Sequence, residues 1–478
     1  MIKKAYIAGK WVETKDQLEV ANPYDGSVFA KVSLCGANEI EQALAAAYAC
    51  RAEMAALEPY QRAEALNFIR DRILQRAEEF AQVLSQENGK TIVESRVEVV
   101  RAAATFDIAA GESTRIYGEA YDLGINKMGA GRRCIVRHYP VGVVSAIAPF
   151  NFPLNLAIHK IAPALAVGCP IVLKPASKTP VTSLLLAEII EQSGLPKGAF
   201  SVVPSGRVAG QMLVEDDRIN LLTFTGSPEV GWKMKRDAGK KKVVLELGGN
   251  AGLIIDKDLS EKDWDWLISR AVMGAFYQSG QVCISVQRIF AHRDIYDEFK
   301  ERFTRATKAL QAGDPLDEST TLGPIVDTNN RDRLKGWIDE AVAGGAKVLA
   351  GNIIAKCGQG NSLQATILED VDPNLTICRE EAFGPVVTLT AVDSMDEAFE
   401  RVNDSDFGLQ CGIFTNDFDT VMRAFDALEV GGVIHNDVPS YRVDSMPYGG
   451  VKDSGLGREG IRYAMHDMLE ERVLVYKA

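Results

Sequence analysis

The fold class is decided by residues 141–174, which read VGVVSAIAPFNFPLNLAIHKIAPALAVGCPIVLK. The two ends of this stretch, 141–148 and 169–174, are short apolar runs rich in β-branched residues, a composition typical of buried strands. Similar runs follow at 199–204 and 220–226, and helical patterns at 181–193 and 229–238 alternate with them. This alternation predicts right-handed βαβ units and a parallel sheet.

A second α/β region is expected after Gly249. One strand is predicted at 386–392, and helical patterns occur at 261–278, 294–311, 329–343 and near 395–402. Towards the N-terminus, two amphipathic helices are predicted at 38–57 and 59–88. The segments 121–139 and 471–477 look like strands remote from both cores, which would suit a sheet shared between subunits.

Composition and charge narrow the class of protein. A chain of 478 residues is too long for one compact core, so we expect two or three structural units. The net charge of −12 and the pI near 5.2 disfavour nucleic acid as a partner, because non-specific affinity for nucleic acid comes mainly from Lys and Arg. The apolar stretch 141–173 is interrupted by prolines, Asn151, His159 and Lys160. We therefore expect a cytoplasmic protein without a membrane span.

The cysteines give no framework for a fold. They stand at positions 35, 50, 134, 169, 283, 357, 378 and 411, without any Cys-x-x-Cys pair. This scatter argues against disulfides and a structural zinc site, and we expect no metal. Most free cysteines are inert apolar fillers, so a functional one has to be identified by its neighbours.

One carboxylate stands where burial should be costly. Glu246 lies within VVLELGG, residues 243–249, an apolar run that ends in two glycines. Burying a carboxylate costs several kcal/mol unless it is paired or neutral. A general base with a raised pKa would explain Glu246, and a buried salt bridge would explain it equally well.

Two further segments place reactive groups beside predicted elements. Cys283 lies in GQVCIS, residues 280–285, just after a predicted helix, although a lone cysteine is more often a small core residue. Asn151 follows the strand 141–148, at a sheet edge where its amide could donate to a developing oxyanion. An Asn in a proline-framed turn is the simpler alternative.

A phosphate-binding helix terminus is predicted after the strand that ends at Thr225. Ser227 is a good N-cap and Pro228 suits the first helical position. The free N–H groups of such a helix would hold a pyrophosphate, although capping alone also explains the residues. No G-x-G-x-x-G follows a strand here, so a motif search alone would not indicate a dinucleotide site.

Together these motifs resemble the aldehyde dehydrogenase superfamily. The resemblance spans essentially the whole chain and rests on PFNFP at 149–153, VLELGGN at 244–250, GQVCIS at 280–285, EEAFGP at 380–385 and MPYGGVKDSG at 446–455. The chain is most similar to the lactaldehyde-dehydrogenase-like branch. The resemblance implies an α/β fold with a Rossmann-like cofactor domain, an α/β catalytic domain and a small β oligomerisation extension. The expected boundaries are 1–119 with 140–249, 250–454, and 120–139 with 455–478, respectively.

Residue by residue, the resemblance implies that Cys283 is the nucleophile, Glu246 the base and Asn151 the oxyanion donor. An aldehyde would then be oxidised to a carboxylate through a thioester on Cys283, which water activated by Glu246 would hydrolyse. Lys160 and Glu459 match positions that the family uses around proton transfer. Surface ion pairing explains each of these two residues equally well.

The resemblance also implies a nicotinamide cofactor, NADP or NAD. Its expected contacts are Lys174 at the adenosine ribose, Ser227 at the pyrophosphate, Glu381 at the nicotinamide ribose and Phe383 at the ring, with Phe150, Ser177 and Gly226 in the same site. Ser177 stands where many NAD-preferring members have Glu, and lysines flank it. A 2′-phosphate would therefore be tolerated or attracted, so we expect a preference for NADP with NAD also usable. The loop 204–210 is shorter than the usual glycine loop of the family.

Substrate signals are few. Members that select an acidic semialdehyde often have Arg six residues before the nucleophile, and this chain has Tyr277 there. His159, Tyr441 and Arg442 are candidates for substrate contact, although a structural role suits each as well. We expect a short hydroxyaldehyde such as lactaldehyde, or a small semialdehyde, and a homodimer or homotetramer.

Two rival functions remain. A coenzyme-A-acylating dehydrogenase would pass the acyl group to coenzyme A, but such relatives usually lack the glutamate that Glu246 provides here. A non-catalytic protein could reuse the scaffold, but Cys283, Glu246 and Asn151 are all retained.

Overall fold

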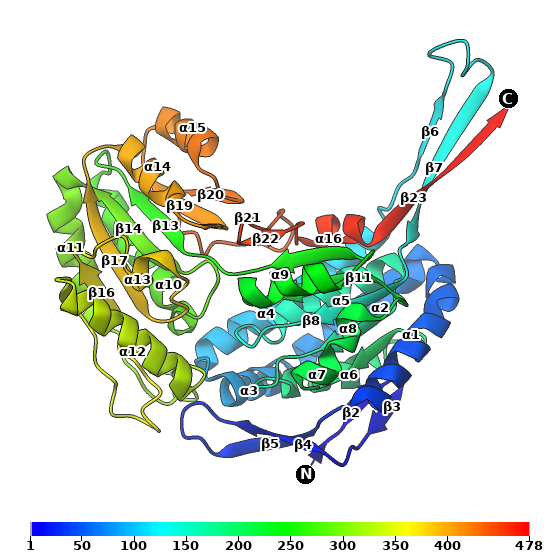
Figure 1. Cartoon of the computed structure of the whole chain (residues 1–478), viewed down its shortest axis with the longest axis horizontal. Helices are drawn as coiled ribbons and strands as arrows, with labels where there is room; N and C mark the ends of the chain where they lie inside the picture. Colours follow the sequence, from blue (N-terminus) through cyan, green and yellow to red (C-terminus); the bar gives the residue numbers. More distant parts are fainter. Residues whose placement is uncertain (1, 478) are drawn as a thin grey trace.

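Two large β-sheets organise the chain, and a third, smaller sheet projects from the body (Figure 1). The structure is a computed structural model and describes residues 2–477. The α/β fold expected from the alternation of strands and helices is confirmed.

The first large sheet has the strand order β22-β12-β11-β8-β9-β10-β2-β3. Its five central strands are parallel: β12 (Lys242–Glu246), β11 (Ile219–Thr225), β8 (Val143–Ile147), β9 (Ile171–Lys174) and β10 (Phe200–Val202). The outer strands β2 (Ala5–Ile7), β3 (Lys10–Val12) and β22 (Gly455–Leu456) are added antiparallel. Helices α5 (Asn155–Val167), α6 (Val181–Ile190), α7 (Arg207–Gly210), α8 (Met212–Glu215) and α9 (Pro228–Asp237) connect the strands.

Helix α5 is buried along its whole length, because the sheet lies on one side and helices α2, α4 and α16 cover the others. An all-round apolar surface is what such a position requires. Two polar residues of α5, His159 and Lys160, are only 1% exposed. Buried groups of this kind need partners.

Four helices near the N-terminus pack on this unit: α1 (Ala37–Ala56), α2 (Pro59–Gln75), α3 (Ala77–Asn88) and α4 (Ile92–Ser113). The prediction of a single helix at 59–88 is wrong, because two helices, α2 and α3, occupy this segment. The backbone leaves helical geometry at Arg76, with φ −107° and ψ 20°, and its side chain pairs with Glu79 and Glu188. The apolar spacing continues across this break, so periodicity alone does not reveal it.

The second large sheet has the order β15-β16-β17-β14-β13-β19-β20, in which only β15 is antiparallel to its neighbour. Its strands are β13 (Ala251–Ile255), β14 (Val286–His292), β15 (Lys347–Ala350), β16 (Thr366–Glu369), β17 (Val386–Val392), β19 (Gln410–Phe414) and β20 (Gly432–His435). Its helices are α10 (Trp264–Phe276), α11 (Arg293–Lys308), α12 (Thr328–Ala343), α13 (Thr376–Arg379), α14 (Met395–Asn403) and α15 (Phe418–Ala427). The helix expected at 261–278 is shorter, because a 3₁₀ turn (Glu261–Asp263) precedes it and an irregular turn (Tyr277–Gly280) ends it.

The projecting sheet consists of β6 (Glu119–Asp122), β7 (Arg132–Pro140) and β23 (Leu469–Lys477), all antiparallel (Figure 1). The segment 455–467, which we expected in this extension, instead belongs to the body. There β22 pairs with β12, and α16 (Ile461–Asp467) packs on α5. This segment stays with the body because Gly455 and Leu456 pair with the otherwise free edge of β12.

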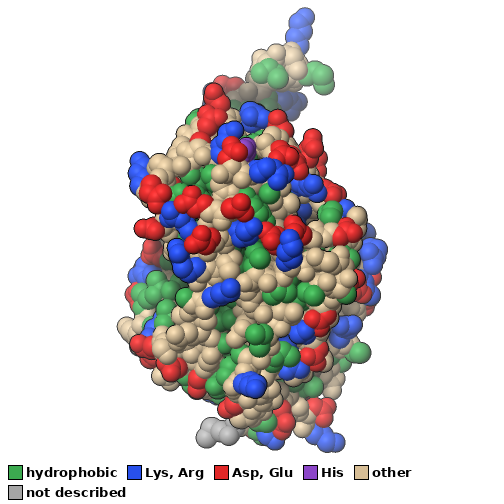
Figure 2. Space-filling view, turned by 90° about the vertical axis from the view of Figure 1, so that its left-hand side faces the viewer, with side chains coloured by type: hydrophobic (Ala, Val, Ile, Leu, Met, Phe, Trp, Pro, Cys, Tyr) green, Lys and Arg blue, Asp and Glu red, His purple; other side chains and the backbone are tan. Residues whose placement is uncertain are grey.

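Short pairings complete the fold. They are a sheet of β1 (Ile2–Lys3), β5 (Val28–Ser33) and β4 (Gln17–Ala21), and a pair of β18 (Phe407–Gly408) with β21 (Val451–Lys452). Within residues 2–477, none of the helices combines the length and apolar character needed to cross a membrane. Figure 2 shows acidic and basic side chains interspersed on one face of the molecule, without a broad area of a single sign.

Candidate active site

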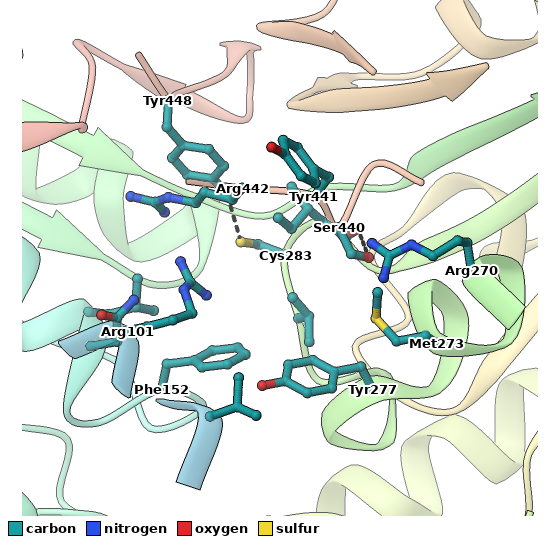
Figure 3. Close-up of a pocket in the computed structure, with 15 residues that line it drawn as sticks. Arg101, Phe152, Arg270, Met273, Tyr277, Cys283, Ser440, Tyr441, Arg442 and Tyr448 are labelled. Atoms are coloured by element: carbon teal, nitrogen blue, oxygen red, sulfur yellow. Dashed lines mark hydrogen bonds between the residues drawn. The ribbon is translucent and has the colours of Figure 1, made fainter. Parts of the chain in front are cut away.

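A cavity of about 330 Å³ lies against Cys283, where helices of both large units meet. Figure 3 shows Cys283 with Tyr448 and Arg442 on one side and with Phe152 and Tyr277 on the other. The other lining residues are Val97, Arg101, Asn155, Leu156, Arg270, Met273, Val282, Ile284, Ser440 and Tyr441.

A strained turn carries the chain from α10 to Cys283. Gln278, Ser279 and Gly280 have φ values of 53°, 54° and 68°, a left-handed run that costs about 1 kcal/mol or more for each non-glycine residue. The Gln278 N–H donates to Glu94 Oε1 at 2.9 Å, and Ser279 Oγ donates to the Gly323 carbonyl at 2.7 Å. These hydrogen bonds hold the turn in place.

Glycine is required at the end of this turn. A Cβ on Gly280 would lie 2.1 Å from the carbonyl oxygen of Gly384. The close approach brings the segment that carries Glu381 and Phe383 beside the segment that carries Cys283. The GQVC motif therefore has a backbone role as well as a chemical one.

The Cys283 thiol is half-buried and lies next to a phenol. Its Sγ is 3.1 Å from Tyr448 Oη. Burial raises the pKa of this thiol to about 12, and the hydrogen bond with Tyr448 acts in the opposite direction. Ionisation of Cys283 therefore depends on the groups around it.

Glu246 is the last residue of β12 and is only 3% exposed. Neither of its carboxylate oxygens has a hydrogen-bond partner among the described residues. Burial, with the nearby Glu459 adding to it, raises the pKa of Glu246 well above its ordinary value. This environment agrees with a base of raised pKa and not with the buried salt bridge that the sequence left open.

Asn151 lies beside the segment that carries Cys283, since its Nδ2 donates to the Gln281 carbonyl at 2.9 Å. An amide nitrogen carries two hydrogens, so one remains to face a reacting oxygen. Asn151 follows β8, Glu246 ends β12, and Cys283 precedes β14. The structure thus brings together three residues that are far apart in the chain.

Lys160 and Glu459 form a buried ion pair, with Lys160 Nζ 3.0 Å from Glu459 Oε1. Both are nearly inaccessible, at 1% and 2% exposure, so surface ion pairing is excluded for them. Lys160 also donates to Thr223 Oγ1, and Arg442 donates to the other Glu459 oxygen at 3.0 Å. Burial alone would raise the pKa of Glu459, but Lys160 and Arg442 lower it to about 2.

The pair extends into a larger set, which we call the buried ion network: Lys160, Glu459, Arg442, His159, Asp444 and Arg101. Arg442 Nη2 lies 3.1 Å from His159 Nδ1, and His159 Nε2 lies 2.9 Å from Asp444 Oδ1. Arg101 Nη2 donates to the same Asp444 oxygen at 2.9 Å. Although burial opposes it, His159 and the two arginines hold the pKa of Asp444 below its ordinary value.

The network separates the candidate substrate residues into two groups. Tyr277, Tyr441 and Arg442 line the cavity, whereas His159 is not among the lining residues and lies behind Arg442. Sequence reasoning missed Arg101 and Arg270, which lie on α4 and α10. No local motif marks either one, and only the packing of these helices brings both to the cavity.

The candidate cofactor residues follow one edge of the first sheet. Helix α9 begins at Pro228 with Ser227 at the N-cap, as expected, and the exposed Ser227 side chain makes no capping hydrogen bond with the described residues. The first N–H groups of α9 therefore remain for an anion. Gly226 precedes them, and its N–H donates to the carbonyl of Glu246.

Glu381 and Phe383 lie where this edge meets the second sheet. Gly249 N–H donates to Glu381 Oε1 at 3.0 Å, and burial raises the pKa of Glu381 to about 7. The rings of Phe383 and Phe150 meet edge to face, with centroids 5.7 Å apart. These groups together fit a dinucleotide. The carboxyl group could accept hydrogen bonds from ribose hydroxyls, the aromatic rings could contact a flat base, and the N-terminus of α9 could bind the phosphates.

The residues expected near the adenosine end of the cofactor differ in their exposure to solvent. Lys174 ends β9 and is half-buried, and burial lowers its pKa. Ser177 is exposed, and Lys178 forms an ion pair with Asp327. Of the lysines that flank Ser177, Lys178 is thus already engaged with a carboxylate.

Comparison with known proteins gives the same assignment as the geometry. The model of the "Aldehyde dehydrogenase family" matches residues 11–474. A 3-sulfolactaldehyde dehydrogenase of Priestia megaterium is 44% identical over 98% of this chain and 97% of its own length. A lactaldehyde dehydrogenase of Methanococcus aeolicus is 37% identical over 98% and 99%, respectively.

Solved structures agree. Aldehyde dehydrogenase 21 of Physcomitrella patens, in complex with the reaction product succinate, superimposes with a TM-score of 0.97 at 46% identity and covers 100% of this chain and 98% of its own. Relatives at 36% and 30% identity were solved with NADP and with NAD⁺: a glyceraldehyde-3-phosphate dehydrogenase of Methanocaldococcus jannaschii and a betaine aldehyde dehydrogenase of Staphylococcus aureus. Their TM-scores are 0.92 and 0.94, and they cover 97% and 99% of this chain and 100% and 96% of their own.

The family match covers nearly the whole chain, Cys283 lines the cavity, and Asn151 and Glu246 lie around the segment that carries this thiol. These findings lead to one conclusion. The chain belongs to the aldehyde dehydrogenase family of NAD- and NADP-binding oxidoreductases.

Proposed function

We propose that this protein oxidises a short aldehyde to the corresponding carboxylate by way of a thioester on Cys283, which water then hydrolyses. The observation that carries the proposal is the surroundings of a half-buried thiol that lines the cavity. A side-chain amide is hydrogen-bonded to the segment that carries this thiol, and an unpaired buried carboxyl lies close enough to act on the pKa of the thiol. The unit of the first sheet would bind NADP or NAD, and the unit of the second sheet carries the nucleophile.

The chemistry follows from these three residues. The Cys283 thiolate attacks the carbonyl carbon, a C–S bond forms, and Asn151 Nδ2 with the Cys283 N–H stabilises the alkoxide. A bound nicotinamide supplies the acceptor for the hydride. Glu246 then takes a proton from the water that attacks the thioester, the C–S bond breaks, and the carboxylate and the thiol are released. The raised pKa of Glu246 suits this task.

Glu246→Gln tests the hydrolytic step. We expect a burst of about one reduced cofactor per site followed by steady turnover at least about 100-fold below wild type, because only the second half of the reaction needs the base. Stopped-flow absorbance of the reduced cofactor measures both phases, and Cys283→Ala is the control that should give no burst. Steady turnover near the wild-type rate in Glu246→Gln would disprove the role of the base, and rescue by coenzyme A would indicate an acylating enzyme.

We propose further that the substrate carries an anionic group. Arg101, Arg270 and Arg442 line the cavity, and the described lining contains neither Asp nor Glu. The buried ion network has three fixed cations, Lys160, Arg442 and Arg101, for two carboxylates, Glu459 and Asp444. The excess positive charge favours a carboxylate or a sulfonate.

The relatives support a substrate of this kind. One relative is a 3-sulfolactaldehyde dehydrogenase, and 3-sulfolactaldehyde carries a sulfonate. Another was solved with its reaction product succinate, which carries two carboxylates. A cavity of about 330 Å³ has room for a chain of a few carbons. A hydroxyaldehyde or a semialdehyde with a terminal acidic group therefore satisfies both the charge and the size of the site.

Arg101→Met tests the proposed anion contact. We expect kcat/KM for 3-sulfolactaldehyde and succinic semialdehyde to fall about 10- to 100-fold, the effect of losing one charge-assisted hydrogen bond, with uncharged lactaldehyde much less affected. Arg96→Met is the matched control, since Arg96 lies on the same helix and outside the cavity lining. Equal losses for charged and uncharged aldehydes would contradict anion recognition by Arg101.

For the cofactor we propose a preference for NADP, supported by the exposed Ser177 and by Lys174 at the end of the neighbouring strand. Ser177→Glu should lower the ratio of kcat/KM for NADP over NAD by about tenfold or more, because a carboxylate would repel the 2′-phosphate. Steady-state kinetics with both cofactors measures this ratio, with Ser177→Ala as the control that introduces no charge. A ratio unchanged in Ser177→Glu would place the 2′-position away from residue 177.

We propose that the projecting sheet joins subunits into a dimer or a dimer of dimers. Its strand β23 exposes Val473, Leu474 and Val475 at 60%, 58% and 46%. Apolar side chains on an exposed sheet are usually covered by a partner.

A further inference from the structure

Tyr448 contacts the sulfur of the proposed nucleophile directly. Its hydroxyl oxygen is 3.1 Å from Cys283 Sγ, and the ring is only 3% exposed (Figure 3). Tyr448 lies in the segment MPYGG, residues 446–450. A phenylalanine would fill the same space without this contact.

The surroundings of Tyr448 fix its ring. Its backbone exchanges two hydrogen bonds with Glu459, of 3.0 and 2.6 Å. The guanidinium of Arg442 stacks on its face, with Cζ 3.6 Å from the ring centroid, and Glu459 holds Arg442 in turn. The buried ion network therefore sets the direction of the Tyr448 hydroxyl.

Tyr448 remains a hydrogen-bond donor throughout the working pH range. Burial, with the nearby Cys283 adding to it, raises the pKa of Tyr448 well above its ordinary value, so the phenol keeps its proton. A cation on the face of an aromatic ring draws electron density from it and makes the hydroxyl a stronger donor. A thiolate, by contrast, can only accept.

Resting on the function proposed above, we propose that Tyr448 is a catalytic residue that donates a hydrogen bond to the Cys283 thiolate, and that Arg442 is the positioning residue that orients its ring. No proton is transferred at Tyr448. The hydrogen bond stabilises the thiolate before it attacks and weakens when the C–S bond neutralises the sulfur.

Other charged groups near the thiol also influence how readily Cys283 ionises. Arg442 favours the thiolate, whereas Glu381 and Glu246 oppose it. Arg101, Arg270 and Tyr277 belong to the same cavity wall. Because burial by itself disfavours the thiolate, loss of the Tyr448 hydroxyl should make Cys283 harder to ionise.

The test is the pH dependence of alkylation by iodoacetamide, with Cys283→Ala identifying the signal that belongs to this thiol. In Tyr448→Phe we expect the midpoint to move alkaline by about one pH unit, which is about tenfold less thiolate near neutral pH. Tyr277→Phe removes another hydroxyl of the same cavity and should leave the midpoint unchanged. A midpoint in Tyr448→Phe equal to that of wild type would overturn the proposal.

A second readout separates this proposal from the function on which it rests. The pH profile of the single-turnover burst should move alkaline in Tyr448→Phe by the same amount, with the phenylalanine ring preserving the contact with Arg442. Alkylation needs neither aldehyde nor cofactor. A shifted alkylation midpoint in a protein that oxidises no aldehyde would therefore refute the proposed function alone, and unshifted profiles in an active enzyme would refute only the role of Tyr448.

Discussion

Glu459 binds two buried cations, Lys160 and Arg442, whose charges also act on Glu246, and the chemistry of the site depends on this pairing. Lys160 binds one oxygen of Glu459 and Arg442 the other. Since both cations are engaged, Glu246 is left without a partner among the described residues. The pKa of Glu459 is thereby lowered and that of Glu246 is raised, although both carboxyl groups lie in the same buried region. The environment, and not the residue type, decides which of the two acts as a base.

The same ion pair connects the base to the rest of the site. Lys160 comes from α5, so the burial of this helix fixes one end of the network. Arg442 carries the network to the cavity and to the ring of Tyr448. Across the cavity, the left-handed turn at 278–280 carries Cys283, and Glu94 holds it by a hydrogen bond. The buried ion network thus lies opposite the turn at 278–280, whose strained backbone is held by hydrogen bonds. Together they fix the position of the nucleophile relative to the base.

Much of the fold could be predicted from the sequence, because the apolar runs and helices from 141 to 238 have one consistent pattern. The family motifs predicted the meeting of Cys283, Glu246 and Asn151. Local sequence patterns did not predict those features of the structure that depend on contacts between distant segments. Arg76, where the helix breaks, pairs with Glu188 from a distant part of the chain, and the partners of Lys160 and Glu459 depend on how α5 packs. Arg101 could not be assigned to the cavity, because its place there results from the packing of α4 and from Asp444, which lies 343 positions away.

The central claim is that the acyl group is carried by Cys283 and released by Glu246. Intact-protein mass spectrometry of the Glu246→Gln variant, after reaction with an acidic short aldehyde and NADP, tests it most directly. We expect a mass increase equal to one acyl group, located at Cys283 by peptide mapping and absent when the cofactor is omitted. An unmodified protein after cofactor reduction, or an acyl group on any other residue, would contradict the mechanism.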